Sequence, residues 1–68
     1  MSPEQFAVKL KRLREDRGMT QEALARKAGV SRAYLGRLEM KKGRHDPPLS
    51  RLRKLAKALR VKVSALVD

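Results

Sequence analysis

GMTQEALARKAGVSRAYLGRL, residues 18–38, contains two helix-start signals close together. Thr20 and Ser31 are residue types whose side-chain oxygen accepts a backbone N–H at the beginning of a helix. Gly29 lies between the two helices that they would begin, and glycine adopts the left-handed conformation that ends a helix. Neither helix would be stable alone, because isolated helices shorter than roughly 12 residues are marginal in water. The segments on either side must therefore hold them.

The flanking segments show the apolar spacing of further helices. Ser2–Gln5 resembles a capping box with proline at the first helical position, and Phe6, Leu10 and Leu13 follow on one helical face. Two prolines in GRHDPP, residues 43–48, cannot continue a helix, so we expect a loop there. No segment shows the strict alternation of a half-buried strand. The sequence predicts an all-α fold with five helices, over residues 3–17, 21–28, 32–42, 49–59 and 63–67.

The predicted core lies on the inward faces of these helices. Ala25 and Ala28 are small enough to let a second helix approach closely, and Val30 fills the corner between the two central helices. Gly18 and Gly43 are expected to end the first and third helices. The other inward residues are predicted to be Leu24, Leu35, Leu38, Leu49, Leu52, Leu55, Ala56 and Leu59. Residues 1–68 would form one domain, near the lower size limit for a single core without disulfides or metal.

Charge is the most informative feature of the composition. There are 18 Lys and Arg residues against 7 Asp and Glu residues, which gives a formal net charge of +11 and a pI of about 11.2. Such an excess repels itself in the compact state and therefore favours an anionic partner. Nucleic acid is the first candidate, ahead of an anionic membrane surface or an acidic protein. A merely solubilising surface is the remaining alternative.

Several kinds of site and location are disfavoured. There is no cysteine, which leaves no disulfide and no cysteine-ligated zinc site. His45 is the single histidine and no acidic cluster accompanies it. The sequence therefore lacks the residues that a metal site or a nucleophile–base pair would need. The first residues, MSPEQF, lack the features of a secretory signal, and no apolar stretch approaches the roughly 18 residues needed to cross a membrane. We expect a cytoplasmic protein without catalytic activity, metal or cofactor.

The quoted stretch resembles the helix-turn-helix of the Cro/repressor type, the XRE family. The matching positions are Gln21, Leu24, Ala25, Ala28, Gly29, Val30, Leu35 and Leu38, flanked by Thr20 and Ser31. The match extends to Leu13-Arg14-Glu15, to Glu39 and to LRKLAKALRV, residues 52–61, and so covers nearly the whole chain. The resemblance implies a compact, repressor-like domain that binds double-stranded DNA, with the helix-turn-helix formed by residues 21–28 and 32–42.

Two places depart from the family pattern. The family commonly has a glycine two residues after the glutamate, whereas Met40, Lys41 and Lys42 intervene here before Gly43. Arg60 stands where a glycine often ends the fourth helix. The resemblance therefore leaves the end of that helix open.

The resemblance also implies which residues contact bases. In this family the third helix enters the major groove with its N-terminal residues against base edges. Carried onto this chain, the candidates are Arg32, Ala33 and Arg37, with Tyr34 beside them. Arginine can donate two parallel hydrogen bonds to guanine, and the alanine methyl group can contact a thymine methyl group. We therefore expect at least one G·C pair in each half-site, although Arg37 is equally well interpreted as a phosphate contact or a solvated charge.

Phosphate contacts are expected at the starts of the two central helices. Gln21 and Ser31 are the candidates, because a helix N-terminus gathers unpaired donors and a positive partial charge. Lys41, Lys42 and Arg44 either extend the basic surface along the DNA backbone or form a solvated loop.

Arg14 and Glu39 have a different expected role. The resemblance pairs them as an internal salt bridge between the first and third helices. Glu39 follows the core face of Leu35 and Leu38, and it would repel DNA if it pointed outward. The alternative for Arg14 is a phosphate ligand.

The resulting function hypothesis is a bacterial or phage transcriptional regulator that binds a two-fold symmetric operator as a homodimer. A second hypothesis is an antitoxin-type module that binds a toxin or another acidic protein, since the resemblance covers such antitoxins too. Membrane binding by residues 49–59 is weaker, because that helix uses its apolar face for the core. Val63, Leu66 and Val67 form either a small apolar patch for the dimer or the closing layer of the monomer's own core.

Overall fold

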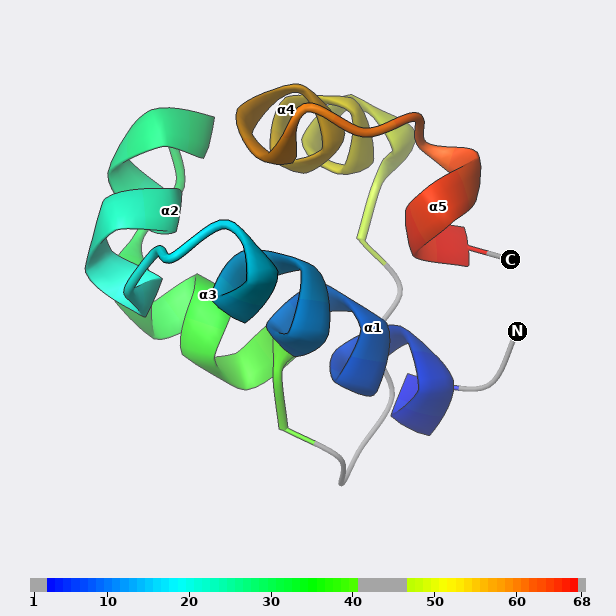
Figure 1. Cartoon of the computed structure of the whole chain (residues 1–68), viewed down its shortest axis with the longest axis horizontal. Coiled ribbons are helices and arrows are strands. Elements are labelled where there is room, and N and C mark those ends of the chain that lie inside the picture. The colour runs from blue at the N-terminus through cyan, green and yellow to red at the C-terminus, as the bar shows by residue number, and fades with distance from the viewer. Residues whose placement is uncertain (1–2, 41–46, 68) are drawn as a thin grey trace.

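The chain folds into short helices that pack around one another (Figure 1). The structure, a computed structural model, describes residues 3–40 and 47–67. Its helices are α1 (Pro3–Asp16), α2 (Gln21–Ala28), α3 (Arg32–Leu38), α4 (Leu49–Leu59) and α5 (Ser64–Val67). No strand occurs in these residues, so the all-α prediction is confirmed. None of the described helices is long and apolar enough to cross a membrane.

One apolar core joins the helices. α2 contacts both α3 and α4, while α1 contacts α3 and α5. The largest fully buried side chains are Phe6, Leu10, Leu24, Leu35, Leu55, Leu59 and Leu66. Leu66 comes from α5, and Val63 and Val67 are half-buried against the same core. Val63, Leu66 and Val67 therefore close the monomer's own core, which is the second of the two roles considered for them.

α1 ends at Asp16, just before the predicted end at residue 17. Gly18 has φ +68°, and the Met19 N–H donates to the Arg14 carbonyl oxygen at 3.1 Å. These are the features of a left-handed helix end. Ser2, the predicted capping residue, lies outside the described residues.

α2 begins and ends where the sequence predicts. The Thr20 Oγ1 atom accepts the Ala23 N–H at 3.0 Å. Gly29 has φ +72°, and its N–H donates to the Arg26 carbonyl oxygen at 3.3 Å. Nothing lies within 4 Å of the position that a Cβ of this glycine would occupy. Glycine is therefore favoured here by backbone conformation and not by lack of space.

The prediction that the third helix reaches residue 42 is wrong, because α3 ends at Leu38. The Met40 N–H donates to the Arg37 carbonyl oxygen at 3.2 Å. The two residues are three positions apart, which is the hydrogen-bond spacing of a 3₁₀ turn and not of an α-helix. Leu38 is also the last apolar residue of the core face, since lysines follow three and four positions later. The predicted end at Gly43 lies outside the described residues.

α4 has the predicted bounds, but one of its predicted core residues is exposed. Leu49 has 53% of its surface exposed, so its assignment to the core is wrong. It is the first residue of the helix. Leu52 is half-buried, and Leu55 and Leu59 are fully buried. Burial therefore increases along α4 from its start to its second turn.

Arg60 ends α4 in the left-handed conformation, with φ +58° and ψ +42°. It is the one non-glycine residue with positive φ in the described chain. The Val61 N–H donates to the Ala56 carbonyl oxygen at 3.0 Å, so this is a left-handed helix end without the usual glycine. For a residue with a Cβ, this conformation costs about 1–2 kcal/mol.

We expect Arg60→Gly to be more stable than Arg60→Ala by about 1 kcal/mol. Both variants remove the same charge and side chain, but only alanine retains the Cβ that strains the backbone. The greater freedom of glycine in the unfolded chain offsets part of the gain. Urea denaturation followed by circular dichroism measures the difference. Equal stability of the two variants would contradict a strained helix end.

Candidate nucleic-acid interface

The outer face of α3 carries three of the four residues predicted to contact bases. Arg32, Ala33 and Arg37 are exposed, whereas Leu35 and Leu38 on the other face are buried in the core. α3 is therefore fixed by its apolar side and presents two guanidinium groups and a methyl group to solvent. These are groups that can form hydrogen bonds and apolar contacts with base edges.

Tyr34 differs from the other three because its ring is half-buried and packs against the core. The Arg51 guanidinium carbon lies 4.5 Å from the centre of this ring. That distance is typical of a cation–π contact, which links α3 to α4. Helical periodicity does not reveal this pairing, because the partners come from two different helices.

Ser31 is exposed and caps α3. Its Oγ atom accepts the Tyr34 N–H at 3.0 Å. Accepting that bond uses an oxygen lone pair and leaves the hydroxyl hydrogen available to donate. Capping and the predicted phosphate contact are therefore compatible at this residue.

The structure brings Arg14 and Glu39 together as a two-pronged ion pair between α1 and the end of α3. Arg14 Nε lies 2.7 Å from Glu39 Oε2, and Arg14 Nη2 lies 3.0 Å from Oε1. The third guanidinium nitrogen, Nη1, donates to the Met19 carbonyl oxygen at 2.7 Å. The exposed fractions of the Arg14 and Glu39 side chains are only 10% and 3%. The pair therefore holds α1, the α1–α2 turn and α3 together.

The hydrogen bond to Glu39 raises the pKa of Arg14 above its ordinary value, against the opposing effect of burial. The negative charges of Glu39 and Glu15 act in the same upward direction. Arg14 is therefore a permanent cation whose hydrogen-bonding groups point inward. This geometry argues against the alternative in which Arg14 is a phosphate ligand.

Gln21 is a third member of this network. Its Nε2 atom donates to Glu39 Oε1 at 3.2 Å, and the residue is half-buried. Its Oε1 atom lies beside α3, 3.8 Å from the position that a Cβ of Gly36 would occupy. Spacing along the chain could not reveal this role, because Gln21 and Glu39 are distant in sequence. Of the two phosphate candidates predicted at helix starts, Gln21 thus has an internal partner.

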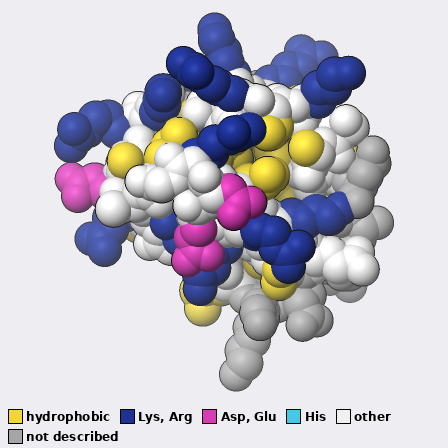
Figure 2. All heavy atoms as spheres, in the orientation of Figure 1, with side chains coloured by type: hydrophobic (Ala, Val, Ile, Leu, Met, Phe, Trp, Pro, Cys, Tyr) yellow, Lys and Arg dark blue, Asp and Glu magenta, His cyan; other side chains and the backbone are white. Residues whose placement is uncertain are grey.

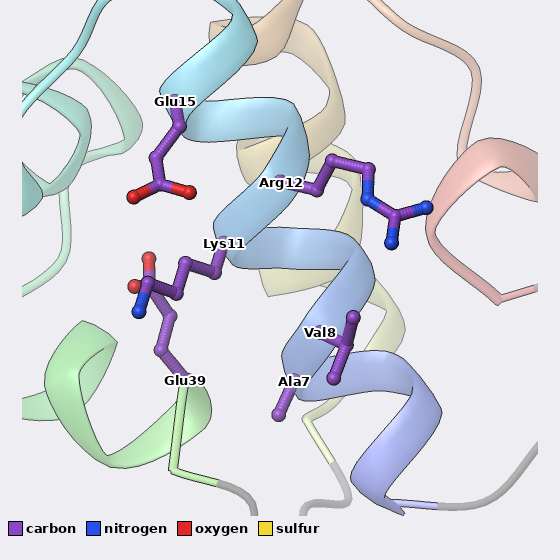
Figure 3. Close-up of a pocket in the computed structure, with 6 residues that line it drawn as sticks. All are labelled: Ala7, Val8, Lys11, Arg12, Glu15 and Glu39. Atoms are coloured by element: carbon purple, nitrogen blue, oxygen red, sulfur yellow. The ribbon is translucent and has the colours of Figure 1, made fainter.

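A hollow of about 300 Å³ lies beside the network, between α1 and the end of α3 (Figure 3). Lys11 and Glu15 project from α1 toward Glu39, whereas Arg12 points to the other side of the helix. Charges of both signs line the hollow, so it does not favour an anion. We do not assign it to the nucleic-acid interface.

Arg17 makes a contact that the spacing of residues along the chain does not predict. Its Nε atom donates to the Leu59 carbonyl oxygen at 2.9 Å. The last carbonyl groups of a helix lack partners within the helix, and a cation is favoured at that end. Arg17 therefore links the end of α1 to the end of α4, and its Nε–H group is used in this internal hydrogen bond.

Lys and Arg side chains spread over the visible face of the molecule, and the Asp and Glu side chains there are fewer (Figure 2). The exposed cations include Arg26 and Lys27 on α2, Arg32 and Arg37 on α3, and Arg51, Arg53, Lys54 and Lys57 on α4. Lys41, Lys42 and Arg44, the other predicted phosphate contacts, lie outside the described residues, as does His45.

Comparison with known proteins identifies the arrangement. A family model described as helix-turn-helix matches residues 10–66. The chain is 44% identical over 59 residues to an immunity repressor protein of Bacillus phage phi105. That match covers 87% of the chain but only 40% of the phage protein, so the chain spans well under half of that relative.

Solved structures agree with the sequence matches. The restriction-modification controller protein C.AhdI from Aeromonas hydrophila has a TM-score of 0.85 and 34% identity, over 94% of both chains. SinR, the master regulator for biofilm formation, solved in complex with DNA, has a TM-score of 0.86 and 32% identity, over 93% of this chain and 98% of that one. The chain therefore belongs to the helix-turn-helix family of DNA-binding transcriptional regulators.

Proposed function

We propose that this protein binds a two-fold symmetric DNA operator as a homodimer, with α3 of each protomer in the major groove, and so regulates transcription in a bacterial or phage system. The observation that carries the proposal is the outer face of α3, where Arg32, Ala33 and Arg37 are exposed on a helix anchored by buried leucines. The names of the phage immunity repressor and of the regulator SinR favour this function over the antitoxin hypothesis.

Arg32 is the principal candidate for base recognition. It is the first residue of α3, where side chains of this class of helix approach the base edges. Its guanidinium group can donate two parallel hydrogen bonds to O6 and N7 of one guanine. Ala33 offers its methyl group to a neighbouring thymine, and Arg37 contacts either a base or the nearer phosphate. Tyr34 is half-buried against the core and has the Arg51 guanidinium over its ring, so less of its side chain is available to a base.

The dimensions of the domain suit a paired arrangement. Its principal extents are 24, 23 and 22 Å. Two half-sites one helical turn apart are about 34–36 Å from centre to centre. Two protomers of this width can therefore lie side by side on one face of a duplex. We propose double-stranded DNA as the partner of this homodimer. We also propose that the protein acts in the cytoplasm.

Phosphate contacts would hold α3 in the groove. The Ser31 hydroxyl group and the backbone N–H groups at the start of α2 are suited to this role. Gln21 would contribute through its backbone, since its side-chain amide already donates to Glu39. Lys41, Lys42 and Arg44 are proposed to extend these contacts along the backbone.

The test is selection of bound sequences from a random duplex pool with the wild-type protein and with Arg32→Ala. We expect the variant to lose preference at one base pair per half-site. A two-hydrogen-bond contact with guanine is worth about 1–3 kcal/mol of discrimination, roughly 5–150-fold. Arg26→Ala is the matched control, because Arg26 is an exposed arginine on α2 and outside α3. Uniform weakening at every position by Arg32→Ala would instead make Arg32 an electrostatic contact.

A further inference from the structure

We infer that Arg51 and Lys54 of α4 form, with the start of α3, a binding site for one DNA backbone phosphate at the edge of the groove that α3 occupies. This inference rests on the proposed function and adds residues of α4 to the interface. It is carried by a hollow of about 410 Å³ between the α2–α3 turn, α3 and α4, here called the α3–α4 cleft. Its polar lining comprises Ser31, Tyr34, Arg37, Arg51 and Lys54.

The charges around the α3–α4 cleft are all positive. Its lining includes Arg37 from α3 and Arg51 and Lys54 from α4. No carboxylate lines it, and none of the described residues forms an ion pair with these three cations. Like charges that converge without a counterion repel one another. A bound anion would relieve this repulsion, so the cleft favours a negatively charged group.

Arg51 is held in place by more than its own helix. Its guanidinium carbon lies 4.5 Å from the centre of the Tyr34 ring, and that ring is itself packed against the core. A guanidinium group stacked on a ring retains its N–H groups at the edge of the plane, where they can donate to phosphate oxygens. Tyr34 is therefore a positioning residue that aims Arg51 into the cleft.

The place of the α3–α4 cleft identifies the anion as a phosphate of the bound duplex. Ser31 lies in the lining and immediately precedes Arg32, the proposed base-reading residue. Arg37 both lines the cleft and is exposed on α3, so the cleft adjoins the face of α3 that we propose enters the major groove. Its volume is more than ten times the roughly 30 Å³ of one water molecule, enough for a phosphate with bound water.

A second hollow lined by cations lies between α2 and α4 and provides a comparison for the α3–α4 cleft. It measures about 440 Å³ and is lined by Arg26, Lys27, Lys54 and Lys57, with no residue of α3. It therefore lacks both the hydroxyl group and the stacked guanidinium of the α3–α4 cleft. Arg53, an exposed residue of α4, lines neither hollow and provides a control of the same charge on the same helix.

The experiment measures affinity for a selected duplex by fluorescence anisotropy, with wild type, Arg51→Ala and Arg53→Ala. We expect Arg51→Ala to weaken binding about tenfold per protomer, the typical value of a hydrogen bond between charged groups. The slope of log K against log salt should become shallower by about 0.9 per protomer. Arg53→Ala should change affinity less than twofold. Equal effects of the two variants, with wild-type binding intact, would overturn the inference.

Neutral methylphosphonate linkages placed one at a time in the duplex locate the phosphate. One position per half-site should weaken wild-type binding about tenfold but leave Arg51→Ala unaffected. Tyr34→Leu should lose the effect of that linkage as Arg51→Ala does, whereas Tyr34→Phe should keep it, because only Tyr34→Phe retains the ring. If every linkage affects both proteins alike, Arg51 does not hold a particular phosphate. Failure of the wild type to bind any selected duplex would instead overturn the proposed function.

Discussion

Arg14→Ala is expected to lower the free energy of unfolding by about 3–5 kcal/mol, and Glu39→Ala by a similar amount. Removing one partner of a largely buried ion pair leaves the other charge in the interior without compensation. Arg14→Ala would strip Glu39 of two hydrogen bonds and the Met19 carbonyl oxygen of one. Domains have only about 5–15 kcal/mol of total stability, so either variant should lose a large fraction of it. Urea denaturation followed by circular dichroism measures the loss.

Glu22 and Arg26 provide the control. They form an ion pair on α2 at 3.4 Å, with about two thirds or more of each side chain exposed. Exposed pairs of this kind contribute only about 0.3–0.5 kcal/mol. Glu22→Ala should therefore unfold close to the wild-type urea concentration. If Arg14→Ala costs no more than Glu22→Ala, the buried pair does not hold the helices together.

A double variant separates the effect of a lone charge from the effect of a lost contact. Replacing both partners of a buried ion pair by apolar residues is often neutral or stabilising. Arg14→Met with Glu39→Met should therefore recover much of the single-variant loss. Recovery should remain incomplete, because Gln21 Nε2 and the Met19 carbonyl oxygen would lose their partners. DNA binding by the folded double variant would also show that Arg14 is not a phosphate ligand.

Local signals in the sequence predicted most of the fold. Thr20 and Ser31 accept backbone N–H groups as expected, and the periodic leucines of α4 from Leu55 onward are buried. Such features depend on residues only a few positions apart, so the sequence itself gives their spacing. The end of α3 and the exposure of Leu49 were predicted wrongly. Both lie beside the connection between α3 and α4, where packing rather than periodicity decides which residues are buried.

The interface was less accessible to sequence reasoning than the fold. The outward position of Arg32 follows from helical periodicity relative to Leu35 and Leu38. In contrast, the contact of Arg51 with Tyr34 depends on how α3 and α4 pack, which neither spacing nor residue type reveals. The bond from Gln21 to Glu39 has the same origin. Partners that meet only after folding require the structure.

DNA affinity is expected to fall steeply with salt concentration. If each protomer neutralises about four phosphates, the slope of log K against log salt should be roughly −3.6 per protomer and about −7 for the dimer. Raising salt from 50 to 200 mM should then weaken binding about 10⁴-fold. With a net charge of +11, we expect this release of counterions to be the main source of affinity. Fluorescence anisotropy over a salt series measures the slope, with circular dichroism confirming that the protein stays folded.

The same salt series distinguishes residues that read bases from residues that hold phosphates. Base contacts release no counterions, so Arg32→Ala should lower the whole line of log K against log salt without changing its slope. Loss of a phosphate contact should make the slope shallower by about 0.9. A slope near zero for the wild type would mean that the basic surface does not face the duplex. In that case, affinity would have to arise from base contacts alone, which the short exposed face of α3 is too small to provide.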